Sequence, residues 1–212
     1  LMRDKIAQRG KTDEYVRVLA YWSSLAETRR PYVYGRDELL DSWHTLLMPR
    51  LISALMLPTE AEQLRAMKGL SRWMSGSLDF TPGTIGGIKV DGTTFHHGGL
   101  YPAYSTGAFA AIGYYCKAVR GTEFNLTEQG RKCFKLALMT MANYTNLRDW
   151  GIGIAGRHPL NKNGRIPDAD VNAFGYLAAL GDLTGSGKAV DPELAGAYLR
   201  LKGTDKELNS LF

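Results

Sequence analysis

The plainest helix signal in the chain is the stretch Thr59-Glu60-Ala61-Glu62-Gln63-Leu64-Arg65-Ala66-Met67-Lys68-Gly69-Leu70-Ser71-Arg72-Trp73-Met74. Its first four residues match a capping box, in which Thr59 and Glu62 satisfy each other's backbone N–H groups at the start of a helix. Apolar residues then recur on one face, at Leu64, Met67, Leu70 and Met74. This spacing predicts an amphipathic helix that begins just after Pro58.

Helical spacing of apolar residues continues on both sides of this stretch. Two such patterns precede it, one capped by Thr12 with an apolar face of Tyr15, Val18, Leu19, Trp22, Leu25 and Ala26, and one from Leu39 that Pro49 ends or kinks. Four follow it, at Ala108 to Val119, from about Thr127, from Val171 to Ala178, and from Asp191-Pro192 to Gly203. No segment shows convincing strand alternation, so we predict an all-α fold of paired antiparallel helices. Periodicity alone leaves a bundle, a solenoid and a toroid open.

Size and charge limit the classes of protein that the chain can belong to. Its 212 residues, of which 44% are hydrophobic, can bury a full core, and no linker divides them. The formal charge of +5 mildly favours anionic partners, but no block of like charges suggests a nucleic-acid-binding arm. We therefore expect no nucleic-acid partner.

Cysteine usage and hydropathy add little about the compartment. Cys116 and Cys133 are too few for a disulfide scaffold and wrongly spaced for a zinc knuckle. No run of eighteen apolar residues occurs, so no membrane span is expected. The chain opens at Leu1 and is expected to be a piece of a longer or processed protein.

Acid-base side chains gather in Asp91-Gly92-Thr93-Thr94-Phe95-His96-His97-Gly98-Gly99-Leu100-Tyr101-Pro102-Ala103-Tyr104. This stretch ends a long glycine-rich segment, and loops of that length inside compact domains are usually functional or disordered. Its two imidazoles and two phenols can exchange protons near neutral pH or after a pKa shift. A purely structural reading has the tyrosines packed on helices and the histidines in solvent. Because adjacent residues of an extended segment point apart, His96 and His97 are not expected to share a metal ion.

A second irregular segment runs from Asn146 to Asp168. Small residues around Arg157 would let the backbone approach a ligand and leave the guanidinium projecting from the loop. Trp150 in the same segment could stack on a sugar ring, whereas core packing is expected for Trp22, Trp43 and Trp73 on apolar helix faces. A surface arginine in a flexible loop is the alternative reading of Arg157.

Taken together, these two segments resemble the catalytic domain of the chondroitin sulfate ABC lyases. The similarity is carried by Asp91-Gly92, His97 and Tyr104, followed by Ala155-Gly156-Arg157-His158-Pro159. The short interval between His97 and Tyr104 favours the ABC type over the related chondroitin AC and hyaluronate lyases. The resemblance covers Asp91 to Asn161 closely and the rest of the chain by helical character.

The resemblance implies a fold, a reaction and a substrate. The fold would be an incomplete (α/α) toroid, with residues 1–212 forming part of one catalytic domain and the following β-sandwich domains absent. The reaction would be β-elimination at 4-linked uronic acids of an anionic glycosaminoglycan, namely chondroitin or dermatan sulfate and possibly hyaluronan. A secreted or periplasmic location in a bacterium is likewise implied by the family alone.

Residue roles are implied in the same way. Tyr104 would act beside the C5 proton and the leaving oxygen as base, acid or both, and His97 would be the second acid-base group. Arg157 would offset negative charge and bind substrate oxygens, with His96, His158, Asn161 and Trp150 as further substrate contacts. No cofactor is expected, although a divalent cation could bind in a missing domain. The family's catalytic glutamate lies beyond Phe212, so the chain is expected to be inactive without the rest of the parent lyase.

Two alternatives remain open at the level of the sequence. A helical module could bind anionic glycans without chemistry, through Arg157, His96 and nearby aromatic residues. A glycoside hydrolase could use a similar toroid, but the glycine-rich segment supplies only Asp79 and Asp91 as carboxylates.

Overall fold

Helices make up most of the computed structural model, which describes residues 2–35, 38–155 and 164–203. The α-helices are α1 (Met2–Gln8), α2 (Thr12–Trp22), α3 (Leu39–Asp41), α4 (Leu47–Met56), α5 (Glu60–Ser77), α6 (Pro102–Val119), α7 (Glu128–Tyr144), α8 (Asp168–Ala178) and α9 (Pro192–Lys202). Shorter turns are the 3-10 helices η1 (Leu25–Arg29) and η3 (Ile152–Ile154) and the π-helical turn η2 (Ser42–Leu46). The predicted helical fold class is confirmed. Within the described ranges, no helix has both the length and the apolar character that a bilayer span requires.

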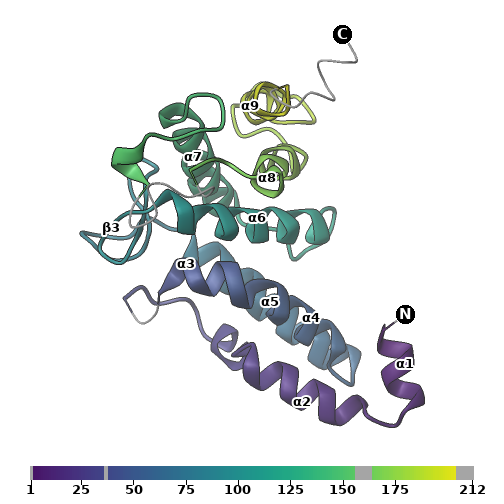
Figure 1. Cartoon of the computed structure of the whole chain (residues 1–212). Helices are drawn as coiled ribbons and strands as arrows, with labels where there is room; N and C mark the ends of the chain where they lie inside the picture. The colour runs from purple at the N-terminus through teal and green to yellow at the C-terminus, as the bar shows by residue number, and fades with distance from the viewer. Residues whose placement is uncertain (1, 36–37, 156–163, 204–212) are drawn as a thin grey trace.

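Helix α6 lies at the centre of the arrangement. The short connection between α4 and α5 makes these two helices an antiparallel pair below α6 in Figure 1, and α7, α8 and α9 lie above it. α6 packs on α8 closely enough that a Cβ added at Gly113 would lie 2.6 Å from the Cβ of Ala173. The neighbours α4 and α5, and α8 and α9, pair as predicted, whereas α6 packs mainly on α8 rather than on its successor α7. Closure of the helices into a toroid stays a prediction.

Side-chain caps fix three helix starts where the sequence predicts them. Thr59 accepts a hydrogen bond from the backbone N–H of Glu62 and its own N–H donates to the Glu62 carboxylate, which completes the capping box. Thr127 and Asp191 cap α7 and α9. The cap predicted at Thr12 is wrong, because Lys11 is the residue before α2 and makes no side-chain cap.

The prediction for α2 is also wrong about which side chains are buried. Only Val16 is buried among its residues, and Trp22 is 74% exposed. Tyr15, Val18 and Trp22, predicted to face the core, therefore face outward, since α2 lies at the edge of the described helices (Figure 1). Leu25, predicted on the same face, is buried as expected, although it lies in η1. Trp43 and Trp73 are buried, as predicted.

The irregularity predicted at Pro49 lies earlier in the chain. Pro49 is inside α4, and the irregularity is the π-helical turn Ser42–Leu46 that joins α3 to α4. Proline has no backbone N–H to donate to the carbonyl four residues earlier, so the regular hydrogen-bond pattern cannot continue through this region. A wider turn before the proline accommodates the missing donor.

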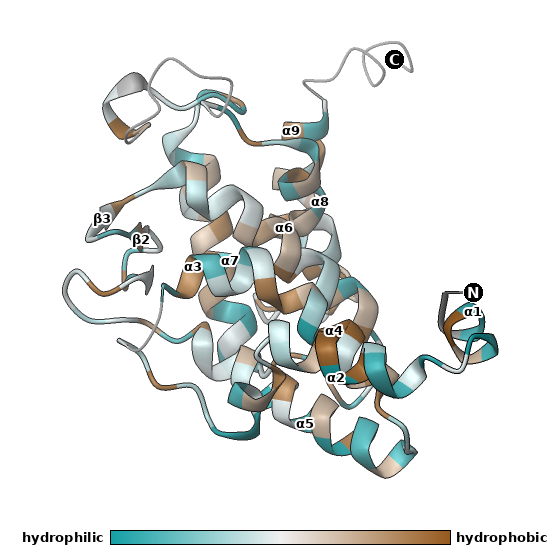
Figure 2. Cartoon of the chain, turned by 60° about the horizontal axis from the view of Figure 1, so that its bottom comes forward, coloured by the Kyte–Doolittle hydropathy of each residue, from teal (hydrophilic) through white to brown (hydrophobic). Residues whose placement is uncertain are grey.

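Three short strands form in the glycine-rich segment, so the prediction that it contains no strand is wrong. β1 (Gly87–Ile88), β2 (Thr94–His96) and β3 (Gly99–Leu100) pair antiparallel in the order β1-β2-β3. They are too short for an alternating pattern to be visible in the sequence. Figures 1 and 2 both place this small sheet and η3 on one side of the helices.

Two buried anchors hold the sheet against the helices. Lys89 is buried, and its ammonium donates to Thr81 Oγ1 at 2.9 Å and to the carbonyl of Ile85. At the turn between β1 and β2, Gly92 has a φ of +81°, and a Cβ there would lie 2.8 Å from the carbonyl oxygen of Leu136 on α7. The glycine therefore lets the turn dock on α7.

Candidate active site

The candidate site is built on the hairpin between β2 and β3. Its two-residue turn is His97-Gly98, and His96 pairs with Gly99 across the strands. Both turn residues have positive φ, +51° for His97 and +81° for Gly98. This is the geometry of tight hairpin turns whose twist matches that of the flanking strands. A histidine in this left-handed conformation is uncommon, which draws attention to the position.

The turn brings the two imidazoles together. The ring centroids of His96 and His97 lie 3.9 Å apart, and the rings are tilted by 43°. The expectation that adjacent histidines would point apart is therefore wrong, because it assumed an extended backbone at both residues and His97 has already left the strand. His96 is buried, whereas the side chain of His97 is 45% exposed.

A carboxylate from a distant part of the sequence lies against both imidazoles. Glu38, just before α3, places Oε2 3.2 Å from Nδ1 of His96 and Oε1 3.8 Å from Nδ1 of His97. Asp41 at the end of α3 places Oδ2 3.7 Å from Nε2 of His96. These two acids cannot be recognised from the sequence, since acidic residues at the start of a helix are ordinary and nothing in the spacing links them to the hairpin.

Three of these groups have the chemistry of metal ligands. The donor atoms of Glu38, His96 and His97 all lie within 4.8 Å of one another. Imidazole nitrogen and carboxylate oxygen are the ligands of many divalent transition-metal sites. The set could therefore hold such an ion, contrary to the reasoning that adjacent histidines cannot converge.

Two phenols complete the cluster from the start of α6. The ring of Tyr104 lies 4.1 Å from His96 and 5.5 Å from His97, centroid to centroid. Tyr101 lies 4.6 Å from Tyr104, is buried, and its hydroxyl has no hydrogen-bond partner among the described residues. Tyr104 is only half-buried, so its phenol is not enclosed in apolar packing.

Hydrogen bonds lock the hairpin to α6. The hydroxyls of Thr94 on β2 and Ser105 on α6 bond to each other, and Ser105 also donates to the carbonyl of Tyr101 at 3.1 Å. The backbone N–H of Tyr101 donates to the carbonyl of Thr94 at 3.2 Å. Pro102 occupies the first helical position, where its missing N–H leaves no helical bond unmade. The tyrosines are thus held at a fixed place relative to the imidazoles.

The predicted site residues of the second segment fall into two groups. Arg157, His158 and Asn161 lie outside the described residues. Trp150 is 6% exposed, and its Nε1 has no hydrogen-bond partner within the described ranges. Its indole packs in the core, which disfavours the sugar-stacking role predicted for it.

Comparisons with a family profile and with curated proteins agree that the chain is similar to lyases. The profile of the family described as "Lyase, catalytic" matches residues 1–208. A chondroitin sulfate ABC exolyase of Bacteroides thetaiotaomicron is 32% identical over 205 residues, which are 97% of this chain and 20% of that protein. In Proteus vulgaris, a chondroitin sulfate ABC exolyase is 32% identical over 78% of this chain and 16% of its own length. A chondroitin sulfate ABC endolyase of the same organism is 29% identical over 100% of this chain and 20% of its own length. The chain thus spans about a fifth of the length of these relatives.

Proposed function

The chain belongs to the family of lyase catalytic domains, and from this premise we propose that its parent protein cleaves chondroitin or dermatan sulfate by β-elimination. The observation that carries the proposal is the cluster of Tyr104 with His96 and His97, whose ring centroids lie 4.1 Å and 5.5 Å from that of the tyrosine. Relatives named as chondroitin sulfate lyases give the substrate class.

The proposed reaction removes the C5 proton of a uronic acid and breaks the bond between C4 and the glycosidic oxygen. The electron pair left by the proton becomes the C4–C5 double bond, and the leaving oxygen takes up a proton. A proton next to a carboxylate is too weakly acidic unless positive charge or hydrogen-bond donors stabilise the charge that develops on that carboxylate. The site must therefore supply a base, an acid and a charge-stabilising group.

We assign these tasks to residues of the two segments. Tyr104 takes the C5 proton and protonates the leaving oxygen, because its phenol is half-buried and fixed beside the imidazoles. His97, with an exposed side chain at the hairpin turn, is the base for the opposite epimer. Arg157 is assigned to stabilise the substrate carboxylate on the basis of the family resemblance.

Glu38 has a positioning role in this proposal. Its two carboxylate oxygens approach one nitrogen of each imidazole, and a carboxylate in this place fixes the orientation of a histidine ring. The rings are thereby held facing the phenol. Asp91, in contrast, accepts hydrogen bonds from the N–H and hydroxyl of Thr93. Its carboxylate therefore stabilises the turn between β1 and β2 and is not assigned to the cluster.

The test is the product that the full-length protein makes from chondroitin sulfate. Elimination yields oligosaccharides that end in an unsaturated uronate, which absorbs ultraviolet light and is one water lighter than the hydrolysis product. Saturated products would instead assign the site to a glycoside hydrolase. Chain binding without any cleavage would assign it to a glycan-binding module.

A further inference from the structure

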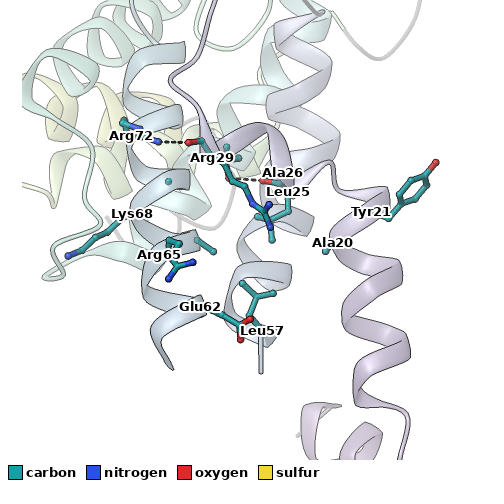
Figure 3. A pocket seen from close by; sticks show the side chains of 13 residues that line it. Ala20, Tyr21, Leu25, Ala26, Arg29, Leu57, Glu62, Arg65, Lys68 and Arg72 are labelled. Carbon is teal, nitrogen blue, oxygen red and sulfur yellow. Dashed lines mark hydrogen bonds between the residues drawn. The ribbon is translucent and has the colours of Figure 1, made fainter. Parts of the chain in front are cut away.

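A basic groove lies between η1 and the first half of α5, on elements other than the hairpin (Figure 3). Its volume is about 720 Å³. The described residues that line it are Ala20, Tyr21, Leu25, Ala26, Thr28, Arg29, Leu57, Glu62, Arg65, Ala66, Lys68, Gly69 and Arg72. None of them belongs to the cluster around Tyr104.

Cationic side chains dominate the groove. Arg29 from η1 and Arg65 from α5 both direct their guanidinium groups into it (Figure 3), and neither has an acidic partner among the described residues. Arg72 donates to the carbonyl of Arg29 at 2.8 Å, which ties the arginine-bearing end of η1 to α5. Lys68 lies 3.4 Å from Glu123.

One carboxylate lines the groove, and it is already engaged. Glu62 accepts hydrogen bonds from the backbone N–H and the hydroxyl of Thr59 in the capping box. Its oxygens are therefore directed to the start of α5 and not to Arg29 or Arg65. Two guanidinium groups that line one groove, with no acidic partner for either among the described residues, favour an anionic ligand that offers several oxygens.

The floor of the groove is apolar and made of small residues. Ala20, Ala26, Ala66 and Gly69 contribute little bulk, and Leu25 is buried beneath them. Gly69 is needed here, because a Cβ at this position would lie 2.8 Å from the carbonyl oxygen of Thr28. A shallow apolar floor between cations matches a sugar ring, which has a C–H face and anionic substituents at its edge.

The aromatic residue of the groove does not offer a stacking platform. Tyr21 is 76% exposed, points away from the groove in Figure 3, and makes an edge contact with Trp22. Single-stranded nucleic acids are usually held by bases stacked on aromatic rings. The groove therefore fits an anionic polysaccharide better than it fits a nucleic acid.

We propose that this groove binds a second, non-reacting stretch of sulfated polysaccharide, with Arg29 and Arg65 holding its sulfate or carboxylate groups. The inference rests on the proposed function only for the kind of polysaccharide. A second contact on the same polymer raises the effective concentration of chain at the reacting site. The groove should therefore raise the affinity for long chains, and it should not change the affinity for oligosaccharides too short to reach both the groove and the reacting site.

The experiment uses full-length protein that carries Tyr104→Phe, so that cleavage does not consume the ligand. Binding of fluorescent chondroitin sulfate chains and of a chondroitin tetrasaccharide is measured with and without Arg29→Ala/Arg65→Ala. A matched control is Arg17→Ala/Arg120→Ala, which removes the same charge from exposed positions outside the groove. We expect the groove variant to weaken binding of the long chain about tenfold, the control to change it less than twofold, and tetrasaccharide binding to stay unchanged.

Three outcomes would overturn the proposal. The first is that the groove variant and the control weaken binding of the long chain equally, which would show that only the net charge of the protein matters. The second is unchanged long-chain binding in the groove variant. The third is single-stranded DNA of equal length and charge competing as well as the glycan. All of these readouts are independent of lyase activity, so they stand apart from the product test of the proposed function.

Discussion

The two ends of helix α6 carry tyrosines in opposite environments. Tyr104 lies in the first turn, half-buried beside two imidazoles, and Tyr115 lies about three turns later in the core. The hydroxyl of Tyr115 donates to the carbonyl of Phe124 at 2.9 Å, and burial raises its pKa well above the ordinary value. The same side chain on one helix is therefore half-buried beside imidazoles at one end and buried with a backbone hydrogen bond at the other.

Carboxylates differ in the same way between these regions. Glu38 is 54% exposed in its side chain and lies against both histidines. Asp170 on α8 is 1% exposed and accepts a hydrogen bond from the backbone N–H of Ala110 in the packed body of α6. The carboxylate of Glu38 contacts the two imidazoles and the solvent, whereas the carboxylate of Asp170 contacts the backbone of α6. Substitutions in the two regions should therefore change different properties.

The largest effect is expected from Tyr104→Phe in the full-length protein. Loss of a general acid-base group should lower kcat about 10³-fold while glycan binding and the melting temperature stay unchanged. The measurement is steady-state kinetics with chondroitin sulfate beside a direct binding assay. A variant that keeps full turnover would remove Tyr104 from the reaction.

Tyr115→Phe is the matched control for that substitution. It removes the hydroxyl that satisfies the Phe124 carbonyl, so it should cost about 1–2 kcal/mol of unfolding free energy and leave kcat unchanged. A large loss of kcat with unchanged stability would mean that the two ends of α6 do not differ as described.

The next effect concerns the packed body alone. Gly113→Ala places a Cβ 2.6 Å from the Cβ of Ala173, so overpacking should destabilise the fold by about 1–3 kcal/mol in thermal or denaturant unfolding. Gly196→Ala on α9 makes the same change where nothing lies within 4 Å, and it should be neutral or stabilising. Equal effects of the two would contradict the close packing of α6 on α8.

Asp170→Asn should change the pH dependence of stability. Burial raises the pKa of Asp170 well above its ordinary value of 3.8, against the opposing effect of the hydrogen bond from Ala110. The folded state then keeps a proton that the unfolded state has lost, so the unfolding free energy falls as pH rises from about 4 through the folded pKa. The asparagine variant should lack this part of the slope in a series of melting temperatures. Parallel curves for the two proteins would show that Asp170 does not titrate differently on folding.

The smallest effect is expected at the hairpin turn. Gly98 has a φ of +81°, and no atom lies within 4 Å of an added Cβ. Gly98→Ala should therefore lower the unfolding free energy only by the backbone strain of a Cβ at positive φ, about 1 kcal/mol. We expect a small loss of stability and a few-fold loss of kcat, since the turn sets the place of His97. Gly83→Ala, also at positive φ and open, is the control that should leave kcat intact.

Local signals in the sequence predicted the parts of the fold that depend on neighbours in the chain. The capping box at Thr59, the cap at Asp191 and the end of α6 near Gly121 follow from hydrogen bonds and conformations within a few residues. The outward face of α2 and the strand pairing of β1 to β3 depend on contacts between distant segments. Such contacts leave no periodic pattern when the strands have two or three residues.

The candidate site could likewise be predicted only where its residues are close together in the sequence. His97 and Tyr104 stood out because acid-base residues in a glycine-rich segment are unusual. Glu38 and Asp41 could not be found, since only folding brings α3 against the hairpin. The convergence of the two imidazoles depends on the left-handed backbone of His97, a conformation that residues other than glycine seldom adopt and that the sequence does not announce.

In the proposed reaction, the uronic acid binds beside Tyr104 at the β2–β3 hairpin. The most direct test of this placement is a crystal structure of the full-length Tyr104→Phe variant with a chondroitin tetrasaccharide. We predict that C5 of the uronate lies about 3–3.5 Å from the position of the missing hydroxyl, the separation of reacting atoms in a near-attack geometry. A uronate bound elsewhere, with no sugar in contact with the phenylalanine or His97, would show that the reaction does not take place at this hairpin.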